Sequence, residues 1–523
     1  MGRQVQGVRS VSWANWFGGV YISESVLPNT VEVEDTPSLS AFIGQFEKGS
    51  TSAVTLVTSW SDFVKTFGSL SATYASTFAA YAFFLNGGQN LLVNRVTGTG
   101  AAAASRTLVD RAGSPLATLR IDADNPGTWG NDIYVAISDN SSDGTRFDLT
   151  VYYGGTTSDK VVEEFVGCSM DSTDAKYVVP FVSQPSRYIT VTNLNSATAS
   201  PNNRPAVLPV GANSRLGSGT GTTVAGANGS APVAADYTTA LTKFDVIPFP
   251  MDLNAPAVSD TTILDDIISY ANTRGDMFVV VDTAAANTVS ATTTYATTLD
   301  TAVKVLVPAG TSNAAIYYPW ITIPDPLAVV PGQTRTIAPG GAVLGLIART
   351  DAVQGPEKAP AGVNAALRNV VAPEKSLTAS DLDTLNAHSV PINAIRSVPG
   401  AGICVMGAKT IKPGAADRYV NIRRTLIYLK SEMQNRLQFA QFENNDQELW
   451  SQITNVLRSF LTTFWQTGGL KGNAPQDAFW IRCDSSNNTA ATIQNGEVRV
   501  EVGVALQYPA EFVVINLTQI TGA

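Results

Sequence analysis

Histidine and cysteine are scarce in this chain of 523 residues, which holds one histidine and three cysteines. The cysteines Cys168, Cys404 and Cys483 lie far apart in the sequence and are odd in number. We therefore expect reduced thiols in a protein made in the cytoplasm, and no zinc site, because zinc needs three or four ligands at local spacing. A serine-histidine-aspartate hydrolase would have to use His388, and no protease-like motif surrounds it. Catalysis by His388 is only a remote alternative.

Long apolar runs and an excess of basic charge are also missing. No stretch reaches about 18 consecutive apolar residues, so the sequence predicts no membrane insertion. The N-terminus has no basic segment followed by an apolar core, so it predicts no secretory signal. The net charge of −9 argues against binding nucleic acid through a basic field. Only 15% of the residues are charged, which suits a protein that buries much surface against neighbours.

One glycine-rich stretch invites a nucleotide-binding interpretation but does not fit it. Residues 192–236 are rich in glycine, serine, alanine, threonine and asparagine, and include the run GSGTGTT. This run has no lysine after its glycines, no GxGxxG spacing and no clear strand before it, which phosphate-binding loops need. We expect a mobile surface loop or linker there, and no cofactor.

The clearest periodic patterns lie in the last quarter of the chain. An apolar stripe with helical spacing predicts an amphipathic helix at about 420–437. Its members are Ile422, Leu426, Leu429, Met433 and Leu437. A second helix is predicted at 446–466, where Asn445 and Glu448 have the spacing of a capping box. The cations on the polar faces of the two helices are Lys430, Arg436 and Arg458.

After these helices the period of the apolar residues changes from 3.6 to 2. Alternation over residues 497–506 predicts a strand with one buried face. The apolar members of that face are Val498, Val500, Val502, Val504 and Leu506. Pro509 then interrupts the ladder. A separate apolar run close to the chain end consists of Phe512, Val513, Val514 and Ile515.

A short β-prone run also lies near the N-terminus. Residues 1–35 show no sustained period, and we expect them to form an arm, with a disordered terminus as the alternative from composition. The run inside this arm comprises Gly19, Val20, Tyr21, Ile22 and Ser23. Strands this short are not stable alone, and an apolar strand edge is rarely left exposed. We therefore predict that both terminal runs insert into the sheet around residues 497–506 of a neighbouring copy of the chain.

Two segments, 36–100 and 206–358, alternate strands with helices, which indicates an α/β layer architecture. The fully apolar run 277–281 suits a buried parallel strand. The apolar run 302–307 is predicted to be another strand.

Residues 101–205, between the two α/β segments, have a different pattern. They contain short alternating stretches separated by polar turns, which is typical of a β-rich inserted domain. The strands predicted in it are residues 119–121, 132–137, 147–153 and 177–182.

Many short motifs occur in an order that is similar to a known family. Towards the C-terminus they read GAKT, RYVNIRR, FENND-x-x-LW, FL-x-x-FW-x-x-G, F-x-x-RCD-x-x-NN, G-x-VRVEVGVA and PAEFVV. Upstream they read GGVYISE, NPGTWGNDI, YYPW-x-x-x-PDP and PGGAVLGLIARTD. Together they resemble the contractile tail sheath proteins of tailed bacteriophages and related contractile injection systems. The N-terminal motif departs from the family's PGVYIEE, because Gly18 stands in place of the proline.

The resemblance implies a multi-domain fold. It implies a subtilisin-like α/β sheath domain over residues 36–100 and 206–358, with the β-rich insert 101–205 on its outside. An α+β C-terminal domain would span 359–508, followed by a C-terminal arm over 509–523.

The resemblance also implies a structural subunit and no enzyme. Such a subunit polymerises helically around a tail tube and contracts to drive the tube through a bacterial envelope. Its partners would be copies of itself, the tail tube protein, and the baseplate and tail terminator proteins. It would be assembled in the host bacterial cytoplasm and located in the virion tail.

The innermost part of such a sheath is its C-terminal domain. The resemblance therefore makes Lys430, Arg436 and Arg458 candidates for contact with the tube, with a plain solvated face as the alternative. For the whole chain, the sheath of a phage-derived bacteriocin or another contractile injection system is the nearest alternative. A subtilisin-like hydrolase and a monomeric binding module are more remote.

Overall fold

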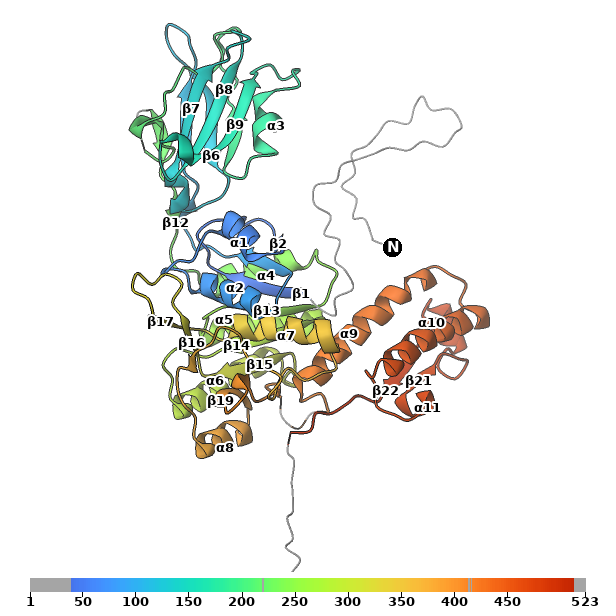
Figure 1. Ribbon diagram of the computed structural model, residues 1–523. Helices are drawn as coiled ribbons and strands as arrows, with labels where there is room; N and C mark the ends of the chain where they lie inside the picture. The colour runs from blue at the N-terminus through green and yellow to red at the C-terminus, as the bar shows by residue number, and fades with distance from the viewer. Residues whose placement is uncertain (1–38, 219–220, 413, 415, 512–523) are drawn as a thin grey trace, which may run out of the picture.

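The computed structural model describes four stretches of the chain, residues 39–218, 221–412, 414 and 416–511. They form a β-rich unit at the top of Figure 1, an α/β unit in the middle and a helical unit at the right. The two terminal runs expected to pair with a neighbour, 19–23 and 512–515, lie outside the described residues. In the described part of the chain, no helix has the length and apolar character needed to span a membrane.

An eight-stranded sheet forms the middle of the α/β unit. In the order in which they pair, its strands are β2 (Thr55–Val57), β3 (Leu91–Arg95), β1 (Leu39–Gly44), β13 (Met251–Asn254), β14 (Met277–Asp282), β15 (Ala314–Tyr318), β19 (Ile392–Val398) and β20 (Gly402–Val405). The inner strands run parallel, and β2 and β20 are antiparallel at the two edges. β14 is buried along its whole length, so the prediction of a buried parallel strand over 277–281 is confirmed.

Helices cover both faces of this sheet. One face packs against α4 (Ala234–Leu241), α5 (Thr261–Arg274), α6 (Val289–Leu306) and α8 (Ala379–Ala387). The other packs against α1 (Trp60–Phe67), α2 (Ala75–Leu85) and α7 (Gly340–Gln354). Side chains of β14 alternate between the two cores: Met277 and Val279 lie on the α5 side, and Phe278 and Val280 lie on the α7 side.

The run 302–307, predicted to be a strand, is instead the end of α6. Thr288 caps the start of this helix through its side chain. Leu299 and Val303, four residues apart, are buried against the sheet, while Val305 is exposed. The burial therefore has helical spacing. The prediction was wrong because a short apolar run has no clear period of its own.

The predicted boundary between residues 358 and 359 comes too early. β19 pairs with β15, and β20 pairs with β19, so both belong to the sheet of the α/β unit. Beside them, a small antiparallel sheet contains β17 (Thr334–Ile337), β16 (Ile321–Pro324) and β18 (Ala372–Pro373). The helix that leads out of the α/β unit is α9 (Val420–Arg436), whose Val420 and Ile427 lie in the α/β core and whose Leu429 lies in the core of the helical unit.

The β-rich unit has two sheets around one core. The first has the order β10 (Ile189–Asn193), β6 (Ala117–Ala123), β5 (Ser105–Val109) and β11 (Thr222–Val224); the second has β7 (Ile133–Asp139), β8 (Phe147–Tyr153) and β9 (Val161–Cys168). At its neck, β4 (Ala101–Ala102) pairs with β12 (Ala227–Asn228). The predicted end at 205 therefore leaves out two strands. Part of the glycine-rich stretch forms β11 and β12 rather than a linker.

One predicted strand of this unit, 177–182, is the short helix α3 (Val178–Ser183). Val178 and Val182 are fully buried and four residues apart, the spacing of a helix face. Pro180 lies in the first turn of α3, where a missing N–H costs no hydrogen bond. A proline inside a predicted strand was the signal against that prediction.

A buried lysine joins the β-rich unit to the α/β unit. The ammonium of Lys48 lies 5.7, 5.4 and 5.2 Å from the ring centres of Trp129, Tyr153 and Tyr188, all of the β-rich unit. Burial lowers the pKa of Lys48, and the three ring faces supply cation–π attraction in place of water. The β-rich unit is therefore docked on the α/β unit by a specific contact as well as by its neck.

Candidate functional site

The helical unit carries the elements on which the assembly predictions depend. It contains the second half of α9, together with α10 (Gln447–Gln466), α11 (Pro475–Ala478), α12 (Ala490–Gln494), β21 (Phe479–Arg482) and β22 (Glu501–Val504). The helices predicted at 420–437 and 446–466 agree with α9 and α10. The cap of α10 is Asp446 rather than Asn445, and its carboxylate accepts from the backbone N–H groups of Glu448 and Leu449.

The predicted strand 497–506 is shorter in the structure, where only β22 forms a ladder with β21. The side chains of Val498 and Val500 still pack on α10, so the predicted apolar face is correct. The Asn488 side chain takes the place of a partner strand at Arg499. Its Oδ1 accepts from the Arg499 N–H at 2.6 Å, and its Nδ2 donates to the Arg499 carbonyl at 3.0 Å. This pairing ends the ladder.

The two-stranded sheet leaves strand edges open within the described residues. The Ala505 N–H donates to the Ala478 carbonyl at 2.8 Å, next to the ladder. Backbone groups alternate in direction along an antiparallel strand, so Glu501 and Gly503 also face β21, and Val502 and Val504 turn their N–H and C=O groups outward. Two strands alone are marginally stable, and open edges are templates for further strands.

The chain leaves this sheet and returns to the α/β unit before the described residues end. Tyr508 donates to the Ala416 carbonyl at 2.8 Å. Glu511 accepts from the Tyr419 hydroxyl at 3.1 Å and pairs with Lys409 at 2.9 Å. The C-terminal arm therefore begins beside the α/β unit rather than beside its own β22. No sequence pattern indicated this anchor, because its contacts join residues 92 positions apart.

The three cations predicted to contact a tube lie on the helices, but they do not form one cluster. Lys430 and Arg458 are exposed and have no ion pair with a described residue. Arg436 pairs with Glu432 at 2.9 Å and lies 4.5 Å from the centre of the Phe460 ring. Arg436 is therefore already partly engaged within its own chain.

Sequence reasoning missed a buried ionic cluster at the root of α9. The guanidinium of Arg424, 3% exposed, binds Asp252 of β13 at 2.7 and 3.0 Å and Asp351 of α7 at 2.9 Å. Burial acts to lower the pKa of Arg424, but the two carboxylates overcome it and raise that pKa. Arg424 lies on the same helix face as the buried Val420 and Ile427, a spacing that could have identified it.

His388, the histidine weighed as a hydrolase residue, lies at the C-terminal end of α8. Its Nδ1 accepts from the Val390 N–H at 3.2 Å, and its Nε2 lies 3.5 Å from the Thr297 hydroxyl.

Asp282 is a fully buried carboxyl group at the end of β14. Its Oδ1 accepts from the Gly340 N–H at 2.7 Å, at the start of α7. Its Oδ2 accepts from Ala257 N at 3.1 Å and from Asn254 Nδ2 at 3.2 Å. Burial raises the pKa of Asp282 to about 6, and these hydrogen bonds oppose the rise. These hydrogen bonds join the end of β14 to the start of α7, so Asp282 ties the sheet to this helix.

Replacing Asp282 with asparagine should remove a pH dependence of stability. The folded pKa of about 6 exceeds the ordinary 3.8, so the folded protein binds this proton more tightly than the unfolded chain does. The stabilisation is complete below pH 3.8 and is lost as the pH rises through about 6. The wild-type free energy of unfolding, measured relative to Asp282→Asn, should fall by ~3 kcal/mol across that window. Urea titrations of both proteins between pH 4 and 7 test this, and a constant difference contradicts it.

The sequence matches two family models in succession. The phage tail sheath protein central domain matches residues 230–411, and the phage tail sheath C-terminal domain matches residues 414–520. Together they cover more than half of the chain, and they meet at the root of α9. The chain belongs to the phage tail sheath protein family.

Two curated tail sheath proteins are similar to about a third of the chain. The tail sheath protein of Vibrio phage KVP40 is 27% identical over 187 residues, which cover 35% of this chain and 26% of the relative. The tail sheath protein of Salmonella phage ViI is 24% identical over 190 residues, covering 36% of this chain and 29% of the relative. The chain thus spans little more than a quarter of the length of the curated relatives it matches.

Solved sheath structures share the fold along nearly the whole chain. The helical sheath of the anti-feeding prophage in its contracted state has a TM-score of 0.56 at 18% identity, covering 96% of this chain and 98% of that one. The sheath tail protein of Listeria innocua has a TM-score of 0.58 at 14% identity, covering 86% and 89%. The mixed α/β, multi-domain architecture is therefore that of sheath proteins.

Proposed function

We propose that this chain is the structural subunit of a contractile tail sheath, which polymerises helically around a tail tube and contracts to drive the tube through a bacterial envelope. The observation that carries the proposal is the two-stranded sheet of the helical unit, whose edges are open in a chain that has a β-prone run near each terminus. Membership of the sheath family supports it. Electron microscopy of the purified protein tests it: hollow striated cylinders are expected, and uniform monomers with peptidase activity would favour the hydrolase alternative.

The links between subunits are proposed to be strands exchanged through the open edges. The run at residues 19–23 and the run at 512–515 would each pair with the sheet around β22 of a neighbour, through the backbone groups that Val502 and Val504 turn outward. Strand addition of this kind gains main-chain hydrogen bonds without needing a deep pocket. Flexible connections beside such ladders would let subunit bodies rotate during contraction while the links persist.

The wider assembly follows from the same proposal. The partners are other copies of the chain, a tail tube protein, and baseplate and tail terminator proteins. The location is the virion tail, after assembly in the host bacterial cytoplasm. A mainly parallel sheet with helices on both faces supports a subtilisin-like description of the α/β unit. A phage-derived bacteriocin or another contractile injection system is the second candidate, since the anti-feeding prophage sheath shares the fold.

Reversing the charge of Lys430 should weaken binding of the sheath to its tube. Because Lys430 has no intramolecular ion pair with a described residue, its charge is available to a partner, whereas Arg436 already pairs with Glu432. We expect Lys430→Glu, and by the same reasoning Arg458→Glu, to weaken co-assembly roughly tenfold at low salt and less at high salt, and Arg436→Glu to have a smaller effect. Lys160→Glu on the β-rich unit is the control. Unchanged co-sedimentation with tubes for all three variants rejects tube contact.

Removing the β-rich unit should leave polymerisation intact. The neck strands β4 and β12 pair with each other, so the two ends of the insert are adjacent and a short glycine-serine linker can replace residues 101–228. We expect the shortened protein to fold and to form narrower cylinders of wild-type length in electron micrographs. A soluble, folded deletion protein that never assembles contradicts an outer, dispensable position for this unit.

A further inference from the structure

The hairpin of β16 and β17 presents an apolar tip to solvent. It follows β15 directly and extends beyond the sheet at the left of Figure 1. The hairpin tip comprises Leu327, Val329, Val330 and Pro331. Leu327 is 41% exposed, Val329 is 95% exposed and Val330 is 57% exposed. No charged residue occurs between Asp325 and Arg335.

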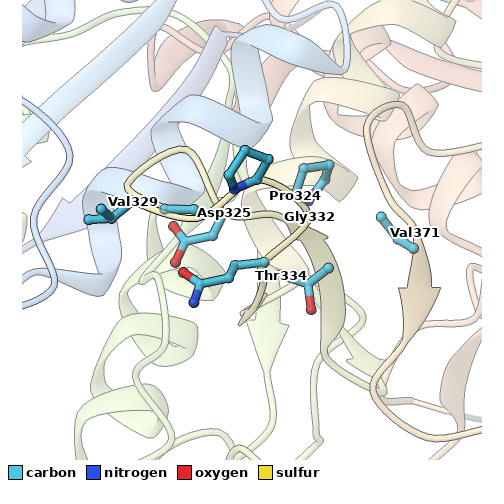
Figure 2. A pocket seen from close by; sticks show the side chains of 9 residues that line it. Pro324, Asp325, Val329, Gly332, Thr334 and Val371 are labelled. Carbon is cyan, nitrogen blue, oxygen red and sulfur yellow. The ribbon is translucent and has the colours of Figure 1, made fainter.

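The hairpin is braced where its strands reach the tip, so the tip is held in a defined position. Asp325 pairs with Arg335 across the hairpin at 3.0 Å and accepts from the Leu327 N–H at 3.0 Å. The Arg335 guanidinium also lies 4.7 Å from the centre of the Phe78 ring on α2. A groove of about 430 Å³ opens beside the tip, between the hairpin and Val371 (Figure 2).

A second set of exposed apolar residues lies at the other end of the sheet, where its parallel strands begin. These basal residues are Val246 and Phe249, just before β13, and Val305 and Leu306, at the end of α6. Val246 is 81% exposed and Val305 is 75% exposed. β13 and β15 run parallel with β14 between them. The residues before β13 and the end of α6, which leads to β15, therefore lie at the end of the sheet where these strands begin. The hairpin leaves from the opposite end of the sheet, where β15 ends.

We propose that the hairpin tip of one subunit docks on the basal residues of a second copy of this chain. Both sets of residues are apolar, as the cores of protein interfaces are, and exposed apolar surface marks an interaction site. Exposed charged residues, Asp245 and Lys304, lie next to Val246 and Val305 in the sequence, as a polar rim does around an interface core. The groove beside the tip suits one aromatic anchor, and Phe249 is the aromatic residue among the basal residues. Surfaces at opposite ends of one sheet give a head-to-tail contact, which builds a helical filament when the rotation between subunits does not close a ring. The contact rests on the proposed sheath function and is separate from strand exchange.

A charge introduced at the hairpin tip tests this docking. Val329→Asp with Val330→Asp should raise the lowest concentration at which polymer forms by at least roughly tenfold, since burying a valine and a tenfold change in an equilibrium are similar in free energy. Val166→Asp on the β-rich unit is the matched control, because Val166 is 53% exposed and belongs to neither surface. Wild-type assembly of the hairpin variant overturns the docking and leaves the sheath proposal standing. Failure of the wild type to assemble overturns the sheath proposal itself.

Cross-linking identifies the occupant of the groove. The native thiols Cys168, Cys404 and Cys483 are buried, so a bismaleimide reagent will act on introduced surface cysteines. A polymerised mixture of Val330→Cys and Val246→Cys subunits should give cross-linked dimers, and either variant polymerised alone should give none. Dimers from Val330→Cys alone, or loss of the mixed dimer with undiminished polymer, overturn the head-to-tail contact.

Discussion

A proline at Val514 is expected to abolish polymerisation and leave a folded monomer. Val514 lies in the C-terminal run, outside the described residues, and its N–H would belong to the ladder formed with the neighbour's β22. Proline removes that donor and fixes φ, which costs ~3 kcal/mol or more in the interior of a regular element. The loss recurs at every contact along a filament, so long sheaths cannot form. Sedimentation and electron microscopy measure assembly, and circular dichroism checks that the monomer is folded.

A matched variant separates backbone pairing from side-chain effects. Val514→Thr keeps the N–H and the β-branched side chain, so this variant should still assemble. Truncation of the chain before Tyr21 should remove the other link and also abolish polymerisation. Long sheaths formed by Val514→Pro, or by the truncated chain, would mean that the terminal strands are not the links between subunits.

Replacing Arg424 with methionine should lower the free energy of unfolding by about 3–5 kcal/mol, because it leaves two carboxylates buried without their partner. Arg424 joins α9 to β13 through Asp252 and to α7 through Asp351. Burial raises the pKa of Asp351, and Arg424 opposes that rise. Without the guanidinium, burial favours the protonated form of Asp351, so the loss of stability should shrink as the pH is lowered. Urea denaturation at two pH values measures both effects.

The control for this change is the same substitution in an exposed pair on the same helix. The Arg436 side chain is 46% exposed and pairs with Glu432 four residues away. Pairs of this kind contribute about 0.3–0.5 kcal/mol, so Arg436→Met should change stability little. Equal losses for Arg424→Met and Arg436→Met would contradict a special role for the buried cluster.

The Arg424 cluster and the proposed exchanged strands are different kinds of connection. The buried cluster of Arg424 is a joint within one subunit, a short distance beyond the point between residues 411 and 414 where the two family models meet. Exchanged strands would be the connections between subunits. Contraction requires that bodies move as units while their links persist, so the first connection should be stiff and the second should tolerate rotation.

The sequence by itself determined the elements whose burial has a regular local period. The helices α9 and α10, the apolar stripe of α10, the alternation around β22 and the apolar run of β14 were predicted correctly, because residues on one face of a helix or strand recur at fixed spacing. The predicted stripe of α9 was correct only in part, since Ile422 and Leu429 are buried and Leu426 is not fully buried. It also determined the family, through motifs in a fixed order. Short apolar runs without a period, at 177–182 and 302–307, were assigned to strands and are helices.

Only the tertiary structure decided where the units begin and end and which residues meet across them. The sheet takes in β19 because β15 offers it an edge, and β20 because it pairs with β19, and no local sequence pattern indicates either pairing. Arg424 lies 172 residues from Asp252 and 73 from Asp351, so the cluster has no signature in the chain. The open edges of β21 and β22, the anchored Glu511 and the braced hairpin tip likewise depend on contacts between distant segments. Local spacing indicates which side of a helix or strand is buried, and only the fold determines which segment that side packs against.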